Sequence, residues 1–292
     1  MKVEKIADTY RVNAGKHFRL KDFDPADTGD WKSKEQAEKT LQEQVVRTAD
    51  LQDKLYAQDA WSLLLIFQAM DAAGKDGAIK HVMTGVNPQG CEVHAFKQPS
   101  ETELQHDFLW RTTNKLPERG HIGIFNRSYY EEVLVVRVHP KILEGQKIPA
   151  PLVRKKIWDE RFEDIRCFER HMARSGTMIR KFFLNVSKKE QKKRFLARLD
   201  EPEKNWKFSA ADVQERGFWD DYHKVYEDMI RNTAAKEAPW YVVPADNKWF
   251  TRLVISTVIV DTLESLNLTF PKVGEAEKKE LAAARKDLEA RK

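Results

Sequence analysis

The sequence has few cysteines and no long apolar run. Only Cys91 and Cys167 occur in 292 residues, which excludes a disulfide framework and a cysteine-based zinc site. No uninterrupted apolar stretch approaches the roughly 18 residues that a membrane span requires, so we predict no transmembrane segment. The first 20 residues carry scattered charges and no apolar segment with a small-residue cleavage site. This argues against a secretory signal and predicts a cytoplasmic protein.

Neither positive nor negative residues are in large excess. The chain has 51 Lys and Arg against 46 Asp and Glu, a net charge of +5. This net charge is only a weak indication of an anionic partner, and local clusters of basic residues are the better guide to such a partner. Hydrophobic residues make up 41% of the chain, enough for the core of one large domain with extensions.

Short apolar segments alternate with amphipathic ones. Strands are predicted at 63–67, 92–96, 122–125, 178–186 and 240–243. Helices are predicted from Ser33 to Leu55, in a stretch ending at Thr84, and at 104–114, 152–174, 188–199, 213–233 and 249–266. This alternation predicts an α/β fold of three layers, a mostly parallel sheet with helices on both faces. We expect this domain at 33–270, an extended N-terminal arm at 1–32 and a charged tail at 271–292.

The connection after the first strand has the features of a phosphate-binding loop. Residues 68–77 read QAMDAAGKDG, with a Gly-Lys pair before a helix. Backbone amides at such a position curl around phosphate oxygens, and the lysine reaches a bridging or terminal phosphate. The sequence departs from the usual pattern at Ala69, normally glycine, and at Asp76, normally a hydroxyl residue. An ordinary turn at Gly74 is the alternative. The loop residues predicted to surround phosphate are Ala72, Ala73, Gly74, Asp76 and Gly77.

Two further positions complete the predicted site. Asp71 lies in a loop whose amides favour anions. Phosphate would displace the Asp71 carboxylate unless a divalent metal bridged the carboxylate and phosphate oxygens, so we infer that Asp71 holds Mg²⁺. The strand at 122–125 ends in Asn126 and Arg127 beside the loop, where open α/β sheets bind ligands. The Asn126 amide oxygen can also ligate Mg²⁺. Arg127 is suited to bridge two phosphates, although it could instead pair with Glu131 or Glu132.

A basic helix follows the fourth predicted strand. Ser187 and Glu190 have the spacing of a capping box, and the helix they open carries six Lys and Arg residues. Such an element can close over a phosphoryl-transfer site as a lid, expected at about 188–212, and neutralise charge there. A solvated charged face is the alternative.

Four stretches of the sequence resemble one family. They are MDAAGKDG at 70–77, FNRSYYEEVL at 125–134, EPEKNWKFS at 201–209 and WYVVPAD at 240–246. They closely resemble the polyphosphate kinase 2 family, over about residues 35–270. The resemblance implies a P-loop kinase fold related to thymidylate kinase, with a helical lid. It also implies Mg²⁺-dependent (or Mn²⁺-dependent) phosphoryl transfer between inorganic polyphosphate and nucleotides, in a homodimer or homotetramer.

The resemblance also implies roles for single residues. The catalytic residues would be Asp71, Lys75 and Arg127, with Asp71 positioning the acceptor and the metal. The polyphosphate-binding residues would be Lys75, Lys80, Arg127, Arg194, Arg198 and Lys207. The nucleotide would lie near Phe96, Lys97, Gln98, Pro99 and Arg111, an expectation that rests on their position after the second strand. Asparagine at 126, where the family commonly has aspartate, resembles the branch that accepts nucleoside mono- and diphosphates.

The expected reaction is therefore reversible transfer of the terminal phosphate of polyphosphate to AMP, ADP, GMP or GDP, with no nucleic-acid or membrane partner. An ATP-dependent nucleoside monophosphate kinase is the alternative enzyme. Against it stand Asp76 and more basic residues than a triphosphate needs. A non-catalytic polyanion-binding or RNA-binding protein, using helix 188–198 and Trp206, is the alternative outside enzymes; its binding would not depend on Asp71.

Overall fold

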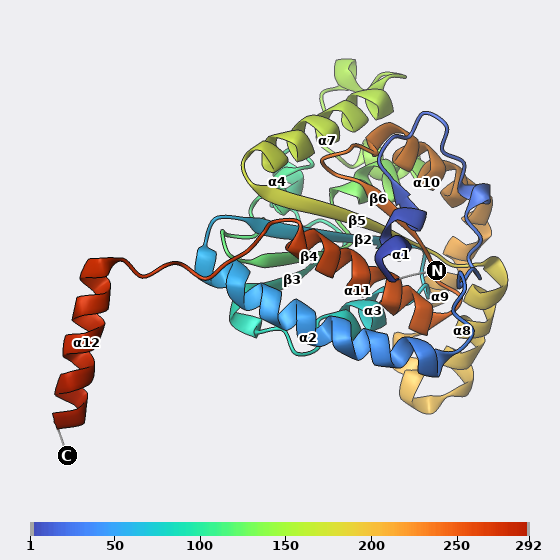
Figure 1. Ribbon diagram of the computed structural model, residues 1–292. Helices are drawn as coiled ribbons and strands as arrows, with labels where there is room; N and C mark the ends of the chain where they lie inside the picture. Colours follow the sequence, from blue (N-terminus) through green and yellow to red (C-terminus); the bar gives the residue numbers. More distant parts are fainter. Residues whose placement is uncertain (1–2, 291–292) are drawn as a thin grey trace.

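A six-stranded sheet forms the centre of the molecule in the computed structural model, which describes residues 3–290 (Figure 1). The strand order is β1-β6-β5-β2-β4-β3, and all neighbours are parallel except β1 and β6. The strands are β1 (Arg11–Val12), β2 (Ser62–Ala69), β3 (Cys91–Ala95), β4 (Ile122–Asn126), β5 (Thr177–Asn185) and β6 (Trp240–Pro244). The predicted mostly parallel α/β fold is confirmed, and the five predicted strands agree to within two residues at each end.

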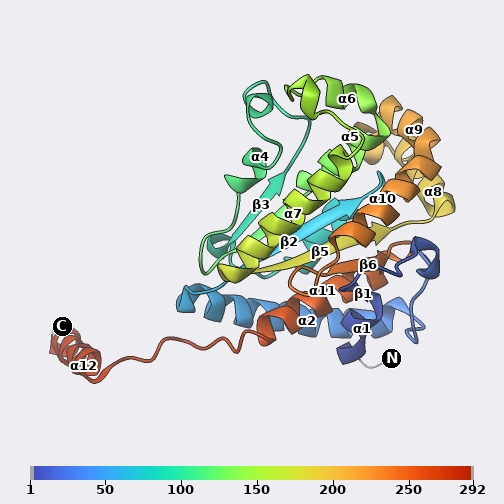
Figure 2. The same ribbon diagram turned by 90° about the horizontal axis from the view of Figure 1, so that it is seen from above.

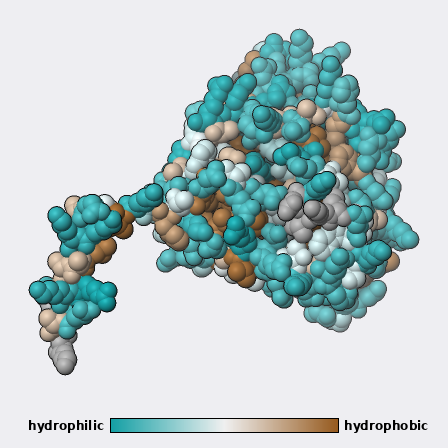
Figure 3. Space-filling model, in the orientation of Figure 1, coloured by the Kyte–Doolittle hydropathy of each residue, from teal (hydrophilic) through white to brown (hydrophobic). Residues whose placement is uncertain are grey.

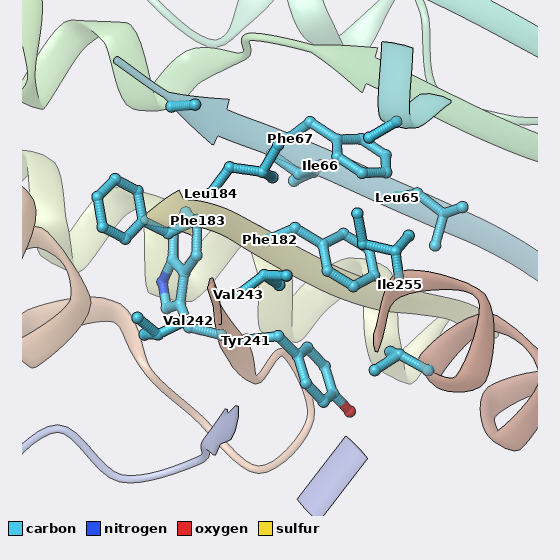
Figure 4. Packing of buried hydrophobic residues seen from close by; sticks show 14 of the residues in the cluster. Leu65, Ile66, Phe67, Phe182, Phe183, Leu184, Tyr241, Val242, Val243 and Ile255 are labelled. Carbon is cyan, nitrogen blue, oxygen red and sulfur yellow. The ribbon is translucent and has the colours of Figure 1, made fainter. Parts of the chain in front are cut away.

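The central strands are apolar because helices cover both of their faces. Every residue of β2 and of β6 is buried. The rings of Phe67 on β2 and Phe182 on β5 stack with centroids 4.9 Å apart, and Ile255 lies near them in the same cluster (Figure 4). A strand buried on both sides has no alternation of apolar and polar residues, which is why continuous apolar runs predicted these strands.

Helices form the two outer layers (Figure 2). One layer contains α1 (Val3–Tyr10), α2 (Lys34–Gln58), α3 (Lys75–Val82; labelled in Figure 1) and α11 (Lys248–Glu264), and the other contains α7 (Ile157–Arg174) and α10 (Trp219–Thr233). The remaining helices are α4 (Trp110–Thr113), α5 (Val135–Val138), α6 (Pro140–Glu144), α8 (Lys188–Asp200), α9 (Ala210–Glu215) and α12 (Glu275–Ala290). The predicted caps are present: Ser33 and Ser187 accept hydrogen bonds from the amides of Gln36 and Glu190.

The prediction of an extended arm was wrong for residues 3–10, which form α1. Ile6 and Tyr10 of this helix are buried, and the Tyr10 ring meets Phe250 of α11 edge-on at 5.9 Å. The Tyr10 hydroxyl donates to Asp27 Oδ2 at 2.7 Å, which ties the following segment to the helix. A helix this short is not stable alone, so α1 forms only because its apolar face packs against α11.

Two predicted helices are interrupted. Residues 104–114 contain only a 3-10 turn (Glu103–Gln105) and α4, because the Asp107 carboxylate accepts the Leu109 amide and starts a new turn. Residues 213–233 divide into α9 and α10, with Gly217 in the 3-10 turn between them.

The C-terminal segment leaves the sheet after α11. Residue Leu268 is buried, whereas α12 stands away from the body with all its described side chains exposed (Figures 1 and 3). None of the helices within residues 3–290 has the combined length and apolar character of a membrane-spanning segment.

Candidate active site

The phosphate-binding loop connects β2 to α3. Gly74 precedes α3 with a φ of 102°, and Ala72 has a φ of 59°, a left-handed conformation that is unusual for a residue with a side chain. The loop therefore curls tightly and brings Lys75 to the start of the helix. This is the local geometry in which backbone amides of a loop and a helix N-terminus face an anion.

The end of β4 lies beside this loop, as predicted, because β2 and β4 are parallel neighbours with Phe67 opposite Asn126. Asn126 Nδ2 donates to Asp76 Oδ1 at 2.7 Å. Arg127, with a φ of 64°, donates from Nη2 to Asp71 Oδ1 at 3.1 Å. The alternative partner of Arg127, Glu131, is also near, with its carboxylate 4.0 Å from Nη1. Arg127 thus lies between two carboxylates.

These residues line one cavity of about 710 Å³, which we call the loop cavity. Nine basic and two acidic side chains line it. The basic ones are Lys75, Lys97, Arg127, Arg194, Arg198, Lys204, Lys207, Lys248 and Arg252, and the acidic ones are Asp71 and Asp76. Such a surplus of positive charge around one space attracts a ligand with many negative charges.

The charged groups around Arg127 act on one another. Burial lowers the pKa of the Lys75 ammonium, and the neighbouring Arg127 lowers it further. Burial raises the pKa of the Glu131 carboxyl, although Arg127 and Lys75 oppose this effect. The pKa of Arg127 is raised: burial acts to lower it, but Glu131 and Asp71 outweigh that effect. An anionic ligand would relieve the repulsion between Lys75 and Arg127.

Arg194 of α8 is engaged with the protein itself. Its guanidinium is buried and donates from Nη1 to the carbonyls of Ala72 and Ala73, at 3.1 and 2.7 Å, and from Nη2 to those of Ala245 and Asp246, at 2.6 and 3.1 Å. Its Nε donates to Glu190 Oε1 at 2.9 Å. Arg194 therefore joins the phosphate-binding loop to the segment after β6. No donor group of this side chain is left without a protein partner.

Arg198 and Lys207 are more open to the cavity. Arg198, one turn after Arg194, pairs with Asp212 at 2.9 Å and donates to the Lys207 carbonyl at 3.2 Å. The Lys207 ammonium lies 4.9 Å from the centre of the Trp206 ring, and Trp206 is 78% exposed. The segment predicted as a lid thus forms one wall of the loop cavity.

A second cavity of about 470 Å³, the aromatic cavity, adjoins the first. It is lined by all five residues predicted to lie near the nucleotide, Phe96, Lys97, Gln98, Pro99 and Arg111. Phe108, Val135 and Ile142 add apolar surface. The two cavities share Phe96, Lys97, Gln98 and Arg127. Arg127 therefore stands where they meet.

Glu132, Arg161 and Gln146 form a hydrogen-bonded network beside the aromatic cavity. Arg161 donates to the Glu132 carbonyl at 2.7 Å and to Gln146 Oε1 at 2.5 Å, and Gln146 donates to Glu132 Oε2 at 2.6 Å. The Arg161 guanidinium also lies 5.2 Å from the centre of the Phe108 ring. This network fixes the wall of the cavity, and sequence reasoning did not identify it.

A buried cluster supports the segment that carries Arg127. Lys181 Nζ, fully buried on β5, donates to Glu169 Oε2 at 2.6 Å and to the Tyr130 hydroxyl at 2.9 Å. The hydroxyls of Tyr129 and Tyr130 donate to Glu169 Oε1 at 2.9 and 2.7 Å. Because these tyrosines follow Arg127 by only two and three residues, the cluster anchors Arg127 to the sheet and to α7.

The predicted polyphosphate-binding residues do not all come together. Lys80 is exposed on α3 and lines neither cavity. Lys204 was predicted only as part of the lid segment, and sequence reasoning missed Lys248 and Arg252 in the loop cavity. A signal for the last two was available: they are four residues apart at the start of the helix after the last strand, hence on one face at the carboxyl edge of the sheet.

Three comparisons place the chain among known proteins. A sequence model described as Polyphosphate kinase 2 matches residues 30–271. The chain is 55% identical over 282 residues to an ADP-polyphosphate phosphotransferase of Rhodopseudomonas palustris, covering 94% of this chain and 98% of that protein. It is 44% identical over 273 residues to an AMP/ADP-polyphosphate phosphotransferase of Meiothermus ruber, covering 92% and 97%.

The fold agrees with these matches. The crystal structure of polyphosphate kinase 2 from Arthrobacter aurescens superimposes with a TM-score of 0.86 at 40% sequence identity and covers 96% of each chain. The resemblance seen in four short stretches of the sequence is thereby confirmed over most of the chain. The chain belongs to the polyphosphate kinase 2 family.

Proposed function

We propose that the protein transfers the terminal phosphate of inorganic polyphosphate to a nucleoside mono- or diphosphate, such as AMP, ADP, GMP or GDP, reversibly. The observation that carries this proposal is the pair of cavities that meet at Arg127, one strongly basic and one partly aromatic. Relatives named as ADP-polyphosphate and AMP/ADP-polyphosphate phosphotransferases support the choice of substrates.

The loop cavity would hold the end of the polyphosphate chain. Its amides and Lys75 would contact the end phosphates, while Arg198, Lys207, Lys248 and Arg252 would neutralise those that follow. Polyphosphate has more negative charge than a nucleoside triphosphate, which accords with nine basic side chains around one space. Arg194 would hold the loop in shape instead of contacting polyphosphate, because its donors already bind carbonyls.

The aromatic cavity would hold the acceptor nucleotide. Phe96 and Phe108 offer ring faces for a base, and Lys97 and Arg111 offer charge near its phosphates. Arg111 is already oriented by a hydrogen bond to the Lys97 carbonyl at 2.8 Å and lies 5.3 Å from the centre of the Phe96 ring. Gln98 and Pro99 complete this side.

The side-chain oxygen atoms in the loop cavity would suit a magnesium or manganese ion. Asp71, Asp76 and Asn126 all line the loop cavity, and the last two side chains are within hydrogen-bonding distance of each other. Among residues 3–290, no three His, Cys, Asp or Glu side chains form a cluster that could hold a metal alone. Mg²⁺ commonly binds one or two carboxylates and completes its shell with phosphate oxygens and water. Bound there, it would neutralise phosphate charge, with Asp71 and Asn126 holding it.

The chemistry needs alignment more than proton transfer. An oxygen of the acceptor's terminal phosphate would form a bond to the end phosphorus of polyphosphate. The bond from that phosphorus to the next bridging oxygen would break, and the shortened chain would keep the electron pair. The attacking oxygen is already anionic near neutral pH, so no general base is required. Lys75 and Arg127 would hold two mutually repelling polyanions in line.

The experiment is to incubate the purified protein with Mg²⁺, polyphosphate and AMP, ADP, GMP or GDP in turn, without ATP, and to separate the nucleotides. The proposal expects a product with one added phosphate. Product formation only when ATP replaces polyphosphate would instead identify a nucleoside monophosphate kinase. Assembly into a homodimer or homotetramer and a cytoplasmic location stay predictions.

A further inference from the structure

The outward face of α8 carries a row of exposed lysines outside the loop cavity. Lys189, Lys192 and Lys193 are exposed and line a shallow groove of about 420 Å³ together with Leu196, Ala197, Asp200 and Glu201. We call this the α8 groove. It shares the basic character of the loop cavity but includes none of the phosphate-binding loop.

The α8 groove adjoins the loop cavity at Ala197. Ala197 lines both, and its small side chain leaves room at the boundary between them. One row along the helix contains Lys189, Lys193 and Ala197, because each follows the previous one by four residues. Eight residues of α-helix rise by about 12 Å. A linear ligand that leaves the cavity over Ala197 would meet both lysines of the row.

The lysines of the groove have little acidic compensation. Among the described residues, neither Lys189 nor Lys192 has a carboxylate at ion-pair distance, and the nearest carboxylate to Lys193 is that of Glu190 at 3.8 Å. Glu190 is also the partner of Arg194. At the other end, Glu201 pairs with Lys204, which leaves Asp200 as the opposing charge.

A solvated helix of this protein looks different. The exposed helix α12 carries four basic and five acidic side chains, and Lys278 pairs with Glu275 and Arg285 with Glu289, so its charges of opposite sign nearly balance. Such a balance is the usual pattern of a face that only contacts water. Helix α8 lacks it, with six basic and two acidic side chains, and the exposed lysines of its groove lie beside the basic loop cavity.

We propose that the α8 groove binds the part of a long polyphosphate chain that extends beyond the loop cavity. This inference rests on the proposed function. Once the chain end is held in the cavity, the following phosphates are at high local concentration near the row of lysines, so weak contacts add to the affinity. Because each contact releases counterions from a polyanion, the gain falls as salt rises. The groove thereby favours long chains over short ones as donors.

The test compares long-chain polyphosphate with tripolyphosphate in the variant Lys189→Gln, Lys192→Gln, Lys193→Gln. All three side chains are exposed, so the variant should keep the wild-type unfolding temperature. For the long chain, KM should rise about tenfold with kcat unchanged, and this rise should shrink at high salt. Tripolyphosphate would be too short to extend beyond the loop cavity, so its KM should stay at the wild-type value.

A matched control carries Lys278→Gln, Lys279→Gln and Lys286→Gln on α12, which removes the same charge far from the groove. It should leave both KM values unchanged. An equal rise in KM for long and short donors in the groove variant, or no rise for either, would overturn the inference. So would an RNA competitor that binds the wild type but not the groove variant while KM for the long chain stays the same. If the wild type used neither donor, the proposed function itself would fail.

Discussion

Replacing Arg194 separates a residue that shapes the phosphate-binding loop from one that contacts polyphosphate. The side chain donates to four backbone carbonyls, two in the loop and two after β6. In Arg194→Met, the carbonyls of Ala73 and Ala245 lose their short bonds of 2.7 and 2.6 Å. At about 1.5 kcal/mol for each charge-assisted bond, the lower end of the usual range, unfolding should become easier by about 3 kcal/mol. For a protein of this size the unfolding temperature should fall by roughly 6–12 °C.

The effect on turnover follows from the same bonds. Without them, Ala72 is no longer held in its left-handed conformation, and the amides that surround phosphate lose their alignment. A displacement of about 1 Å can cost about a hundredfold in rate, so kcat should fall by about that factor. Arg194→Lys should be nearly as impaired, because an ammonium cannot reach carbonyls on two sides as a guanidinium does.

The assay measures kcat, KM for polyphosphate and the unfolding temperature for both variants. Arg198→Lys is the matched control, since Arg198 lies one turn away and donates to only one backbone carbonyl; it should raise KM for polyphosphate with little change in stability. A structural role for Arg194 would be excluded if Arg194→Lys kept the wild-type unfolding temperature and kcat while Arg194→Met raised only KM. Arg194 would then act as a charge toward the substrate.

Three further predictions concern the charged groups. Lys75→Ala should lower kcat by about a hundredfold, equivalent to roughly 3 kcal/mol of transition-state stabilisation, and steady-state kinetics with near-native turnover would contradict the assignment. Removing divalent metal with a chelator should abolish nucleotide formation, and added Mg²⁺ or Mn²⁺ should restore it in a product assay; turnover that persists after chelation would exclude a metal at Asp71. Above pH 10, unfolded tyrosines ionise, whereas burial raises the pKa of Tyr129, Tyr130 and Tyr226 well above 10 in the folded state. The folded state then holds more protons than the unfolded state, so the free energy of unfolding should fall as pH rises. In Tyr129→Phe, urea unfolding at several pH values should show this fall reduced by up to about 1.4 kcal/mol per pH unit. An unchanged pH dependence would mean that Tyr129 ionises without unfolding.

The sequence predicted the features that depend on local pattern. Continuous apolar runs are typical of strands covered on both faces, and they located β2 and β6 to within two residues. The Gly-Lys pair between such a strand and a helix located the loop at Gly74 and Lys75. Because parallel strands end at one edge of a sheet, Asn126 and Arg127 were correctly expected beside it.

The remaining features depend on contacts between distant segments. Helix α1 is too short to be stable alone, and its buried Ile6 packs only in the presence of the assembled sheet and α11. The basic character of Arg194 suggested a phosphate ligand, but its carbonyl partners come from residues about 50 and 120 positions away in sequence. No spacing rule in the sequence connects such positions.

The most direct test is a crystal structure of the protein with ADP and a methylene-bridged polyphosphate that cannot be cleaved. We expect the polyphosphate end in the loop cavity against Lys75 and the nucleotide in the aromatic cavity, with their terminal phosphates facing each other at Arg127. Phosphates of ADP seated on the phosphate-binding loop, with the polyphosphate analogue bound elsewhere, would contradict this expectation.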